Sequence, residues 1–317
     1  MKLLTPPTLI DIEQAHALIR PHIEHTPLLT SGQMNHRVGA QLYFKCENFQ
    51  KAGAFKSRGA LHALLRLSPH ELQYGVVTHS SGNHAQALAR AASMIGTTAY
   101  IVMPENAPQV KVDAVKQYGG KITFCQPTLE AREQATDLIV AETSARVIHP
   151  YNDYDIIAGQ ATACVEMLAQ GGPLDYILCP VGGGGLLSGT LLAAHYLSPE
   201  SRIIGCEPLG ADDAQKSFKT GQLIPSIQPK TIADGLLTSL GTLTFPIIQQ
   251  FAEDIITVGE AEIVAAMRLV WERMKIIIEP SSAVPVAVAL SSKFLQNKKV
   301  GIILSGGNVD LNKLPWL

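Results

Sequence analysis

The chain has 317 residues, of which 46% are hydrophobic and 16% are charged, and its formal net charge is −2 at pH 7. At roughly 100–200 residues per domain, this globular composition predicts two domains or one large α/β unit. The chain carries no basic field, so neither nucleic acid nor an anionic membrane is an expected partner.

Short apolar runs rich in Val, Ile, Tyr and Phe alternate with longer helical patterns along the chain. This alternation is typical of βαβ units and predicts mostly parallel sheets. In chain order, the expected elements are helix Thr8–Ile19, strand Leu42–Lys45, a helical pattern at Leu61, Leu64 and Leu65, strand Gly75–His79, helix Asn83–Ile95, strands Ala99–Met103 and Lys121–Cys125, helix Leu129–Thr143, strand Arg146–His149, helix Ile157–Gln170, strand Tyr176–Val181, helix Leu186–Leu197, strands Arg202–Glu207 and Ile255–Val258, helices Ala261–Met274 and Ser281–Phe294, and strand Val300–Ser305.

The segment from Gly75 to His149 looks like a unit of its own, because it holds four strand candidates with intervening helices and ends at His149-Pro150. We predict that residues 75–149 form a small α/β domain. The larger domain would then consist of residues 1–74 and 150–317.

The cysteines and the lengths of the apolar runs indicate the cellular compartment of the protein. The five cysteines form no C-x-x-C pair, and their odd number and wide spacing argue against a disulfide framework or a structural zinc site. The first residues lack a secretory signal, and no run of about 18 apolar residues occurs. We therefore expect a reduced, cytoplasmic setting without a membrane span.

Four consecutive glycines, Gly182, Gly183, Gly184 and Gly185, stand between a predicted strand and a predicted helix. A loop without Cβ atoms lets successive backbone N–H groups turn toward one anion, and the helix N-terminus adds partial positive charge. The alternative is a flexible turn, but four glycines cost more backbone entropy than a plain turn requires. The motifs of dinucleotide and nucleoside triphosphate sites are absent, so the loop predicts a site for another phosphate.

Lys56 is the candidate for covalent chemistry on a phosphate-bearing ligand. It follows Phe55 in a segment of small residues, and a helical pattern comes after it. In the first turn of a helix, the dipole lowers the pKa of a lysine toward the neutral, nucleophilic amine. By periodicity alone, a solvated surface lysine is the more frequent case.

Polar residues also follow two other predicted strands, where α/β folds place their ligands. Ser80, Ser81, Asn83 and His84 lie between a strand and a helix N-terminus, which suits a substrate carboxylate or simple N-capping. Ser305 ends the last strand, where the alternative is a tight turn.

Glu207 and Asp213 follow another predicted strand and are separated by six positions. Their carboxylates and a free carbonyl between them suit a hard divalent ion, or else a solvated acidic turn. The H-E-x-x-H, G-x-S-x-G and protein-kinase motifs are absent, so metalloprotease, serine-esterase and kinase functions are unsupported.

In their order along the chain, these segments resemble the serine racemase and serine/threonine dehydratase family of fold-type-II pyridoxal 5′-phosphate (PLP) enzymes. The resemblance implies a fold like that of the tryptophan synthase β subunit, with two three-layer α/β/α domains and mostly parallel sheets, in a homodimer. The matching segments are residues 44–50, 53–60, 80–84, 180–185, 207–213, 231–235 and 305–310.

The resemblance implies a role for each matched residue at the cofactor. Lys56 would form the Schiff base with PLP, and Phe55 would lie against the ring. Gly182 to Gly185 would hold the phosphate. Asn83 would contact the 3′-oxygen, and Ser305 would hydrogen-bond to the pyridine nitrogen. Because a serine hydroxyl is neutral, that nitrogen is expected to be largely unprotonated.

The resemblance also implies a substrate site and a metal site. Ser80, Ser81, Asn83 and His84 would surround the α-carboxylate of the substrate, and Ser81 would act as acid or base on the face opposite the lysine. The remaining matches are the family's metal ligands for magnesium, calcium or manganese, namely Glu207, the Ala211 carbonyl and Asp213.

Residues 149–153, 279–285 and 308–316 look most similar to the 3-hydroxyaspartate dehydratases. Arg132 matches an arginine that serves a distal ligand carboxylate in related enzymes, a task that suits a guanidinium because it pairs bidentately. The alternative is an ion pair on a helix surface.

The implied reaction is an α,β-elimination that converts threo-3-hydroxyaspartate, L-serine or L-threonine to a 2-oxo acid and ammonia, with the Lys56 amine removing the α-proton. Serine racemisation is the alternative, since racemases and dehydratases both carry the serine at position 81. A β-replacement synthase and a non-catalytic PLP-carrying protein are the remaining alternatives. The sequence leaves open which substrate is preferred and whether ATP binds.

Overall fold

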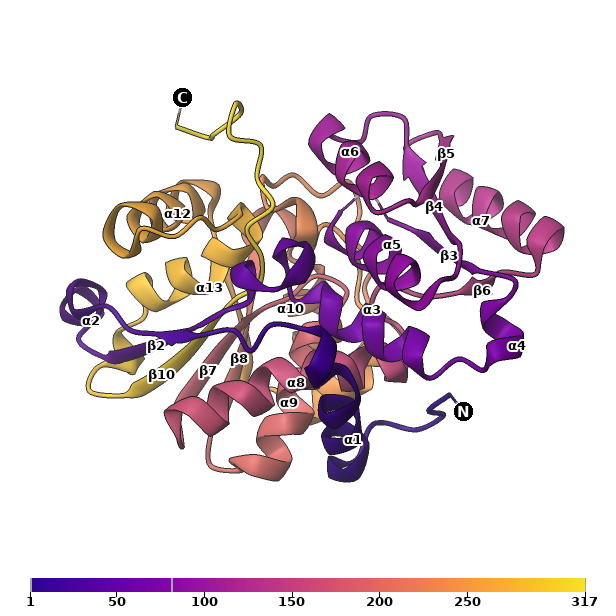
Figure 1. Ribbon diagram of the computed structural model, residues 1–317. Helices are drawn as coiled ribbons and strands as arrows, with labels where there is room; N and C mark the ends of the chain where they lie inside the picture. Colours follow the sequence, from indigo (N-terminus) through magenta and orange to yellow (C-terminus); the bar gives the residue numbers. More distant parts are fainter. Residues whose placement is uncertain (1, 81, 317) are drawn as a thin grey trace.

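The computed structural model (Figure 1) describes residues 2–80 and 82–316, in which ten strands form two separate sheets. The larger sheet has the strand order β1-β2-β10-β7-β8-β9, and the smaller has the order β5-β4-β3-β6. All neighbouring strands are parallel except the pair β1 and β2. The bounds are β1 (Leu28–Leu29), β2 (Gln41–Cys46), β3 (Val76–His79), β4 (Ala99–Pro104), β5 (Lys121–Cys125), β6 (Arg146–Val147), β7 (Tyr176–Pro180), β8 (Arg202–Pro208), β9 (Asp254–Val258) and β10 (Lys299–Leu304).

The predicted α/β class with mostly parallel sheets is confirmed, and every predicted strand is present. The short β1 is the strand that the sequence analysis did not predict. The helices are α1 (Leu9–Ile19), α2 (Gly32–Val38), α3 (Lys56–Leu65), α4 (Pro69–Leu72), α5 (Asn83–Ile95), α6 (Gln109–Gln117), α7 (Leu129–Thr143), α8 (Tyr154–Gly171), α9 (Gly185–Leu197), α10 (Asp213–Thr220), α11 (Thr244–Phe251), α12 (Glu260–Met274) and α13 (Pro280–Ser291).

The unpredicted helices α2, α4, α6, α10 and α11 are short, between 4 and 9 residues each. Helices this short have too few turns for the 3.6-residue period of their apolar residues to be visible in the sequence. A capping signal was nevertheless present for α4, because the hydroxyl of Ser68 and the carboxylate of Glu71 form a capping box. Thr8, where the first predicted helix begins, is the N-cap of α1, and its hydroxyl accepts from the Asp11 N–H.

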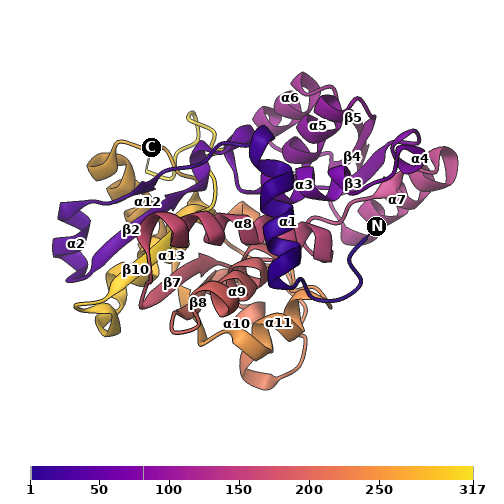
Figure 2. The same cartoon turned by 60° about the horizontal axis from the view of Figure 1, so that its bottom comes forward.

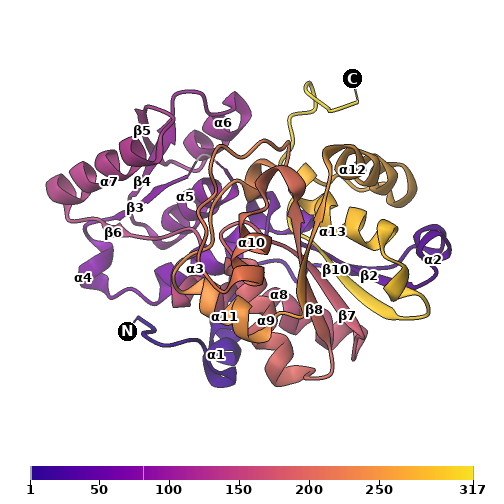
Figure 3. The same cartoon turned by 180° about the vertical axis from the view of Figure 1, so that it is seen from behind.

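The larger sheet is buried on both faces, as expected for parallel strands. Along β7, Ile177 and Cys179 pack with α8 and α9, whereas Tyr176 and Leu178 pack toward the opposite layer with α12 and α13. Figure 2 shows α8 and α9 on one side of this sheet, and Figure 3 shows the opposite aspect, with α12 and α13. In the smaller sheet, α5 covers one face and α7 the other.

Helix α3 is held in place by a close helix crossing and by buried charges. A Cβ on Gly159 of α8 would lie 2.6 Å from the Cα of Gly59, so glycine is needed where α3 and α8 cross. The fully buried Arg58 guanidinium binds the carboxylates of Glu47 and Glu166, each with two of its nitrogens at 2.7–2.9 Å. These contacts fix the start of α3, where Lys56 lies.

The described helices include none with both the length and the hydropathy that a membrane crossing requires.

Candidate functional site

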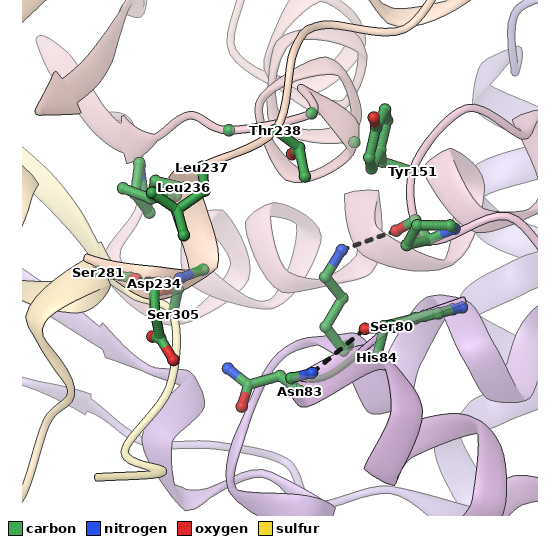
Figure 4. A pocket seen from close by; sticks show the side chains of 18 of the residues that line it. Ser80, Asn83, His84, Tyr151, Asp234, Leu236, Leu237, Thr238, Ser281 and Ser305 are labelled. Atoms are coloured by element: carbon green, nitrogen blue, oxygen red, sulfur yellow. Dashed lines mark hydrogen bonds between the residues drawn. The ribbon is translucent and has the colours of Figure 1, made fainter. Parts of the chain in front are cut away.

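A cavity of about 630 Å³ lies where the two sheets face each other, and its walls come from the segments that follow several of their strands. Figure 4 shows side chains around this space, among them Asn83 and His84 on α5 and Ser305 after β10. The cavity brings together most of the predicted cofactor and substrate residues: Phe55, Lys56, Ser80, Asn83, His84, Arg132, Gly182, Gly183, Gly184, Gly185 and Ser305. Ser81 lies outside the described residues, and the cavity walls do not include Glu207, Ala211 or Asp213.

Lys56 is the first residue of α3 and reaches into the cavity from its base. Its Nζ donates to the carbonyl oxygen of Pro150 at 2.7 Å and lies 5.1 Å from the centre of the Phe55 ring. Burial lowers the pKa of the Lys56 amine to about 8. An appreciable fraction of the amine is therefore neutral near physiological pH, which a nucleophile or a base requires.

Each residue of the glycine loop is held tightly by the surrounding protein. A Cβ on Gly183 would lie 2.3 Å from ring carbons of Tyr151, and one on Gly185 would lie 2.9 Å from the Tyr151 Cβ. At Gly182, the obstacle is the backbone of Leu236 at 2.9 Å. Gly184 has a φ of +87° and would place a Cβ 2.8 Å from Thr244. The loop is therefore closely packed at all four glycines, which favours a fixed loop over a flexible turn.

The N-terminus of α5 also faces the cavity. Gly82 is its N-cap and makes no side-chain capping bond, while the Ser80 hydroxyl accepts from the Gly82 N–H at 3.3 Å. Within the described residues, the first-turn amides of α5 thus have no side-chain cap, and a helix N-terminus of this kind attracts carboxylates.

Asn83 is fixed by hydrogen bonds on both sides of its amide. Its Nδ2 donates to Oε1 of Glu279 at 2.7 Å, and its Oδ1 accepts from Nδ2 of Asn308 at 2.9 Å. Glu279 is buried, and burial together with the charge of Asp234 raises the pKa of its carboxyl to about 7. This network joins α5 to α13 and to the segment after β10.

Two imidazoles beside Lys56, the buried His84 and the half-buried His149, have lowered pKa values that favour their neutral forms. Nε2 of His84 lies 3.3 Å from the carbonyl oxygen of Ile148 and must carry the hydrogen, because the carbonyl can only accept. Burial and then the charge of Lys56 hold the His84 pKa well below its usual range. Burial, followed by His79 and Lys56, lowers the pKa of His149 to about 4.

Arg132 lies on α7 and lines the cavity, and its Nε donates to the carbonyl oxygen of Thr128 at 3.2 Å. Among residues 2–80 and 82–316, Arg132 forms no ion pair. The pKa of His79 is lowered by burial and then by the charge of Arg132. The guanidinium is thus available to an anion in the cavity.

An ion pair lies at the wall of the cavity. Nζ of Lys111, on α6, contacts the carboxylate of Asp234, which begins the short helical turn Asp234–Leu236. Both residues line the cavity, and the Lys111 side chain is largely buried. The pair therefore joins α6, which packs with the smaller sheet, to the turn Asp234–Leu236 at the wall of the cavity.

The predicted metal ligands lie outside the cavity, with Glu207 near the end of β8 and Asp213 at the start of α10. The two carboxylate oxygens of Glu207 accept the backbone N–H groups of Ala214 and Gln215 at 2.8 and 2.9 Å. Neither carboxylate oxygen of Asp213 has a well-aligned hydrogen-bond partner in the described chain, although the Ser226 hydroxyl lies close enough to affect its pKa.

Burial is the main cause that raises the pKa of Glu207 to about 8 and that of Asp213 to about 6. Two buried carboxylates with spare lone pairs fit a hard cation that oxygen ligands prefer. The described residues contain no cluster of three or more His, Cys, Asp or Glu side chains arranged for a metal, so a site here would need the Ala211 carbonyl or water as well.

The sequence analysis assigned no individual role to several cavity residues. Glu279 carried a readable signal, because it is a single acid after the apolar run Ile276–Ile278 and before a helix. Tyr151 appeared only within a matching segment, and its contact with the glycine loop depends on the fold. Asp234 likewise appeared only within a matching segment, and its pairing with Lys111 carried no signal because the two positions are 123 residues apart.

Comparisons with known proteins agree with this geometry. Residues 19–306 match a family model described as pyridoxal-phosphate dependent enzyme. The chain is 49% identical over 311 residues to the β-hydroxyaspartate dehydratase of Paracoccus denitrificans, covering 98% of this chain and 99% of that protein. It is 48% identical over 313 residues to the L-threo-3-hydroxyaspartate ammonia-lyase of Saccharomyces cerevisiae, covering 98% and 96%. The crystal structure of serine racemase from Dictyostelium discoideum superposes with a TM-score of 0.92 at 51% identity, covering 96% and 99%.

Proposed function

The chain belongs to the pyridoxal-phosphate-dependent enzymes, and we propose that it is an ammonia-lyase that converts a 3-hydroxy amino acid to a 2-oxo acid and ammonia, with threo-3-hydroxyaspartate preferred over L-serine and L-threonine. The observation that carries this proposal is the pairing of a cavity lysine of lowered pKa with an arginine that has no ion-pair partner in the described chain. The lysine supplies the chemistry, and the arginine supplies the substrate preference.

The cavity residues fit the cofactor. The tightly packed glycine loop leaves its backbone N–H groups for a phosphate, and Ser305 lines the cavity as a partner for the ring nitrogen. Lys56 would hold the cofactor covalently and Asn83 would bond to its 3′-oxygen. When bound, PLP supplies an electron sink that stabilises negative charge at the substrate α-carbon.

The substrate would be positioned by charge at both of its ends. The N-terminus of α5, with Ser80 and His84 beside it, would bind the α-carboxylate. Arg132 would bind the distal carboxylate that hydroxyaspartate has and serine lacks. The Lys56 amine, neutral above about pH 8, would then take the α-proton, and the 3-hydroxyl would leave with a proton as water. The enamine product, once released, would become an imine, and water would hydrolyse the imine to the 2-oxo acid and ammonia.

Serine racemisation is the second candidate, because the chain is as similar to a serine racemase as to the hydroxyaspartate enzymes. Racemisation requires a proton donor on the face opposite Lys56, the role proposed for Ser81. Chiral analysis of L-serine after incubation separates the two activities.

We propose in addition that Glu207, Asp213 and the Ala211 carbonyl bind Mg²⁺, Ca²⁺ or Mn²⁺. The unpartnered buried oxygens of Asp213 support this proposal. A homodimer, a cytoplasmic setting and a closing domain formed by residues 75–149 are further proposals. The Lys111–Asp234 pair supports the last of these, because it joins α6 to the turn Asp234–Leu236 at the wall of the cavity.

The test is keto-acid and ammonia release from the hydroxyaspartate stereoisomers, L-serine and L-threonine, by wild type, Arg132→Ala and the control Arg146→Ala. Truncating one partner of a hydrogen-bonded charge pair costs about 2–5 kcal/mol, so Arg132→Ala should lower kcat/KM for hydroxyaspartate by at least about 30-fold. Activity on L-serine should change by less than about threefold, within 0.7 kcal/mol. Equal losses on both substrates would instead assign Arg132 to the general structure of the cavity.

A further inference from the structure

A second serine lies directly behind Ser305. Ser282 is the third residue of α13 and is fully buried, and its hydroxyl lies 3.2 Å from the hydroxyl of Ser305. Ser305 lines the cavity and is labelled in Figure 4, whereas Ser282 lies outside the cavity wall. The function proposed above leaves Ser282 without a role.

Each serine hydroxyl has a single proton, and this decides which of the two hydroxyls donates to the other. A serine hydroxyl has one proton to donate and two lone pairs that accept. The Ser282 hydroxyl donates to the carbonyl oxygen of Gly306 at 2.6 Å and accepts from the Gly306 N–H at 2.7 Å. Because a carbonyl can only accept, the single proton of Ser282 is committed to it. In the bond between the two hydroxyls, Ser305 is therefore the donor.

This assignment decides what Ser305 offers to the cavity. With its proton directed toward Ser282, Ser305 presents a lone pair to the cavity. A ring nitrogen that carries a proton can donate to this lone pair while the bond between the serines is kept. An unprotonated ring nitrogen needs the Ser305 proton instead, and the bond to Ser282 is then lost.

The backbone around Ser305 is held by several bonds, so only its hydroxyl is free to turn. The Ser305 carbonyl oxygen accepts from the Phe55 N–H at 3.0 Å, and the Gly306 carbonyl oxygen also accepts from the Glu279 N–H at 3.0 Å. The contact between the two hydroxyls is the longest of the three bonds of Ser282. The Ser305 proton is thus the mobile one, and Ser282 competes for it with whatever occupies the cavity.

We propose that Ser282 is a positioning residue that acts through Ser305 and shifts the ring nitrogen of bound PLP toward its protonated form. This inference rests on the proposed function, in which Ser305 is the partner of that nitrogen. One neutral hydrogen bond is worth up to about tenfold in an equilibrium constant, and the length of this one favours the lower part of that range. A neutral serine as partner favours an unprotonated ring nitrogen. By accepting the Ser305 proton, Ser282 offsets part of this preference.

The test is the ¹⁵N chemical shift of holoenzyme reconstituted with PLP labelled at the ring nitrogen, followed across the neutral pH range. In Ser282→Ala, the ratio of protonated to unprotonated nitrogen at a given pH should fall about twofold to fivefold. Ser282→Thr keeps the hydroxyl and should restore the wild-type curve. Ser291→Ala is the matched control on the same helix, because its hydroxyl bonds to the Ala287 carbonyl oxygen at 3.1 Å, and its curve should equal that of wild type.

A loss of stability in Ser282→Ala does not affect the ¹⁵N measurement. Ser282→Ala leaves the buried Gly306 N–H without its partner and should lower the melting temperature, but the nitrogen signal reports on folded holoenzyme alone. If that variant does not fold, Ser282→Cys keeps a similar size with a weaker donor and acceptor and should shift the curve in the same direction. Unchanged curves in a variant that binds the cofactor would overturn the role of Ser282 and leave the proposed function standing. Wild type that does not bind PLP at all would overturn both.

Discussion

Replacing Gly183 by alanine tests whether packing is what requires glycine in the phosphate-binding loop. The new Cβ would lie 2.3 Å from ring carbons of Tyr151, whereas carbon atoms in contact prefer about 3.5–4.0 Å. The ring or the loop must therefore move by more than an ångström. Overpacking of this kind costs about 1–3 kcal/mol, and the displaced loop should also weaken PLP binding.

The cause can be isolated by removing the obstacle. In the background of Tyr151→Ala, Gly183→Ala should be nearly neutral, so the double mutant should show a coupling free energy of about 1 kcal/mol or more. Gly184→Ala is the matched control. Its cost comes from a φ of +87° and from Thr244, neither of which Tyr151→Ala relieves, so those two changes should be close to additive.

Urea unfolding of the apoprotein gives the free energy of unfolding, and titration with PLP gives the affinity for the cofactor. Both assays are applied to wild type, to the three single mutants and to the two double mutants. If Gly183→Ala costs as much in the Tyr151→Ala background as in the wild-type background, the packing explanation is refuted. The glycine requirement would then come from the backbone or from the ligand itself.

Other predictions concern the lysine and the acidic site. Lys56→Ala should abolish turnover and the visible absorbance of lysine-bound cofactor, and retained turnover would refute the assignment of Lys56. Because the folded pKa of Lys56 is about 8 and its ordinary value is 10.5, the unfolded chain binds the extra proton between these values. The stability of the apoprotein should therefore rise with pH across that window, by up to about 3 kcal/mol, and Lys56→Met should flatten the rise in urea titrations. A chelator should lower the melting temperature of wild type, and added Mg²⁺ should restore it, whereas the melting temperature of Asp213→Asn should respond to neither treatment. A wild type that responds to neither treatment would argue against a metal at this site.

The sequence by itself determined the order and type of the main elements, and it predicted most of the residues that line the cavity. Long periodic segments such as Leu129–Thr143 and compact apolar runs such as Lys121–Cys125 are local signals, and both elements have the predicted bounds. The glycine loop was predicted as a phosphate site because four residues without side chains stand between a predicted strand and a predicted helix, whereas the role of Lys56 was implied by the family resemblance and not by its local pattern. Single short helices such as α10, with 8 residues, carry too little periodicity to be recognised.

Only the tertiary structure decided how distant residues act on one another. The Lys111–Asp234 pair, the packing of Tyr151 on Gly183 and the three bonds of Ser282 all join positions far apart in the chain. The low pKa of Lys56 likewise comes from burial, which a first-turn position in a helix does not reveal. Sequence patterns report the preferences of neighbouring residues, whereas desolvation, steric exclusion and the direction of a shared proton depend on which groups the fold brings into contact.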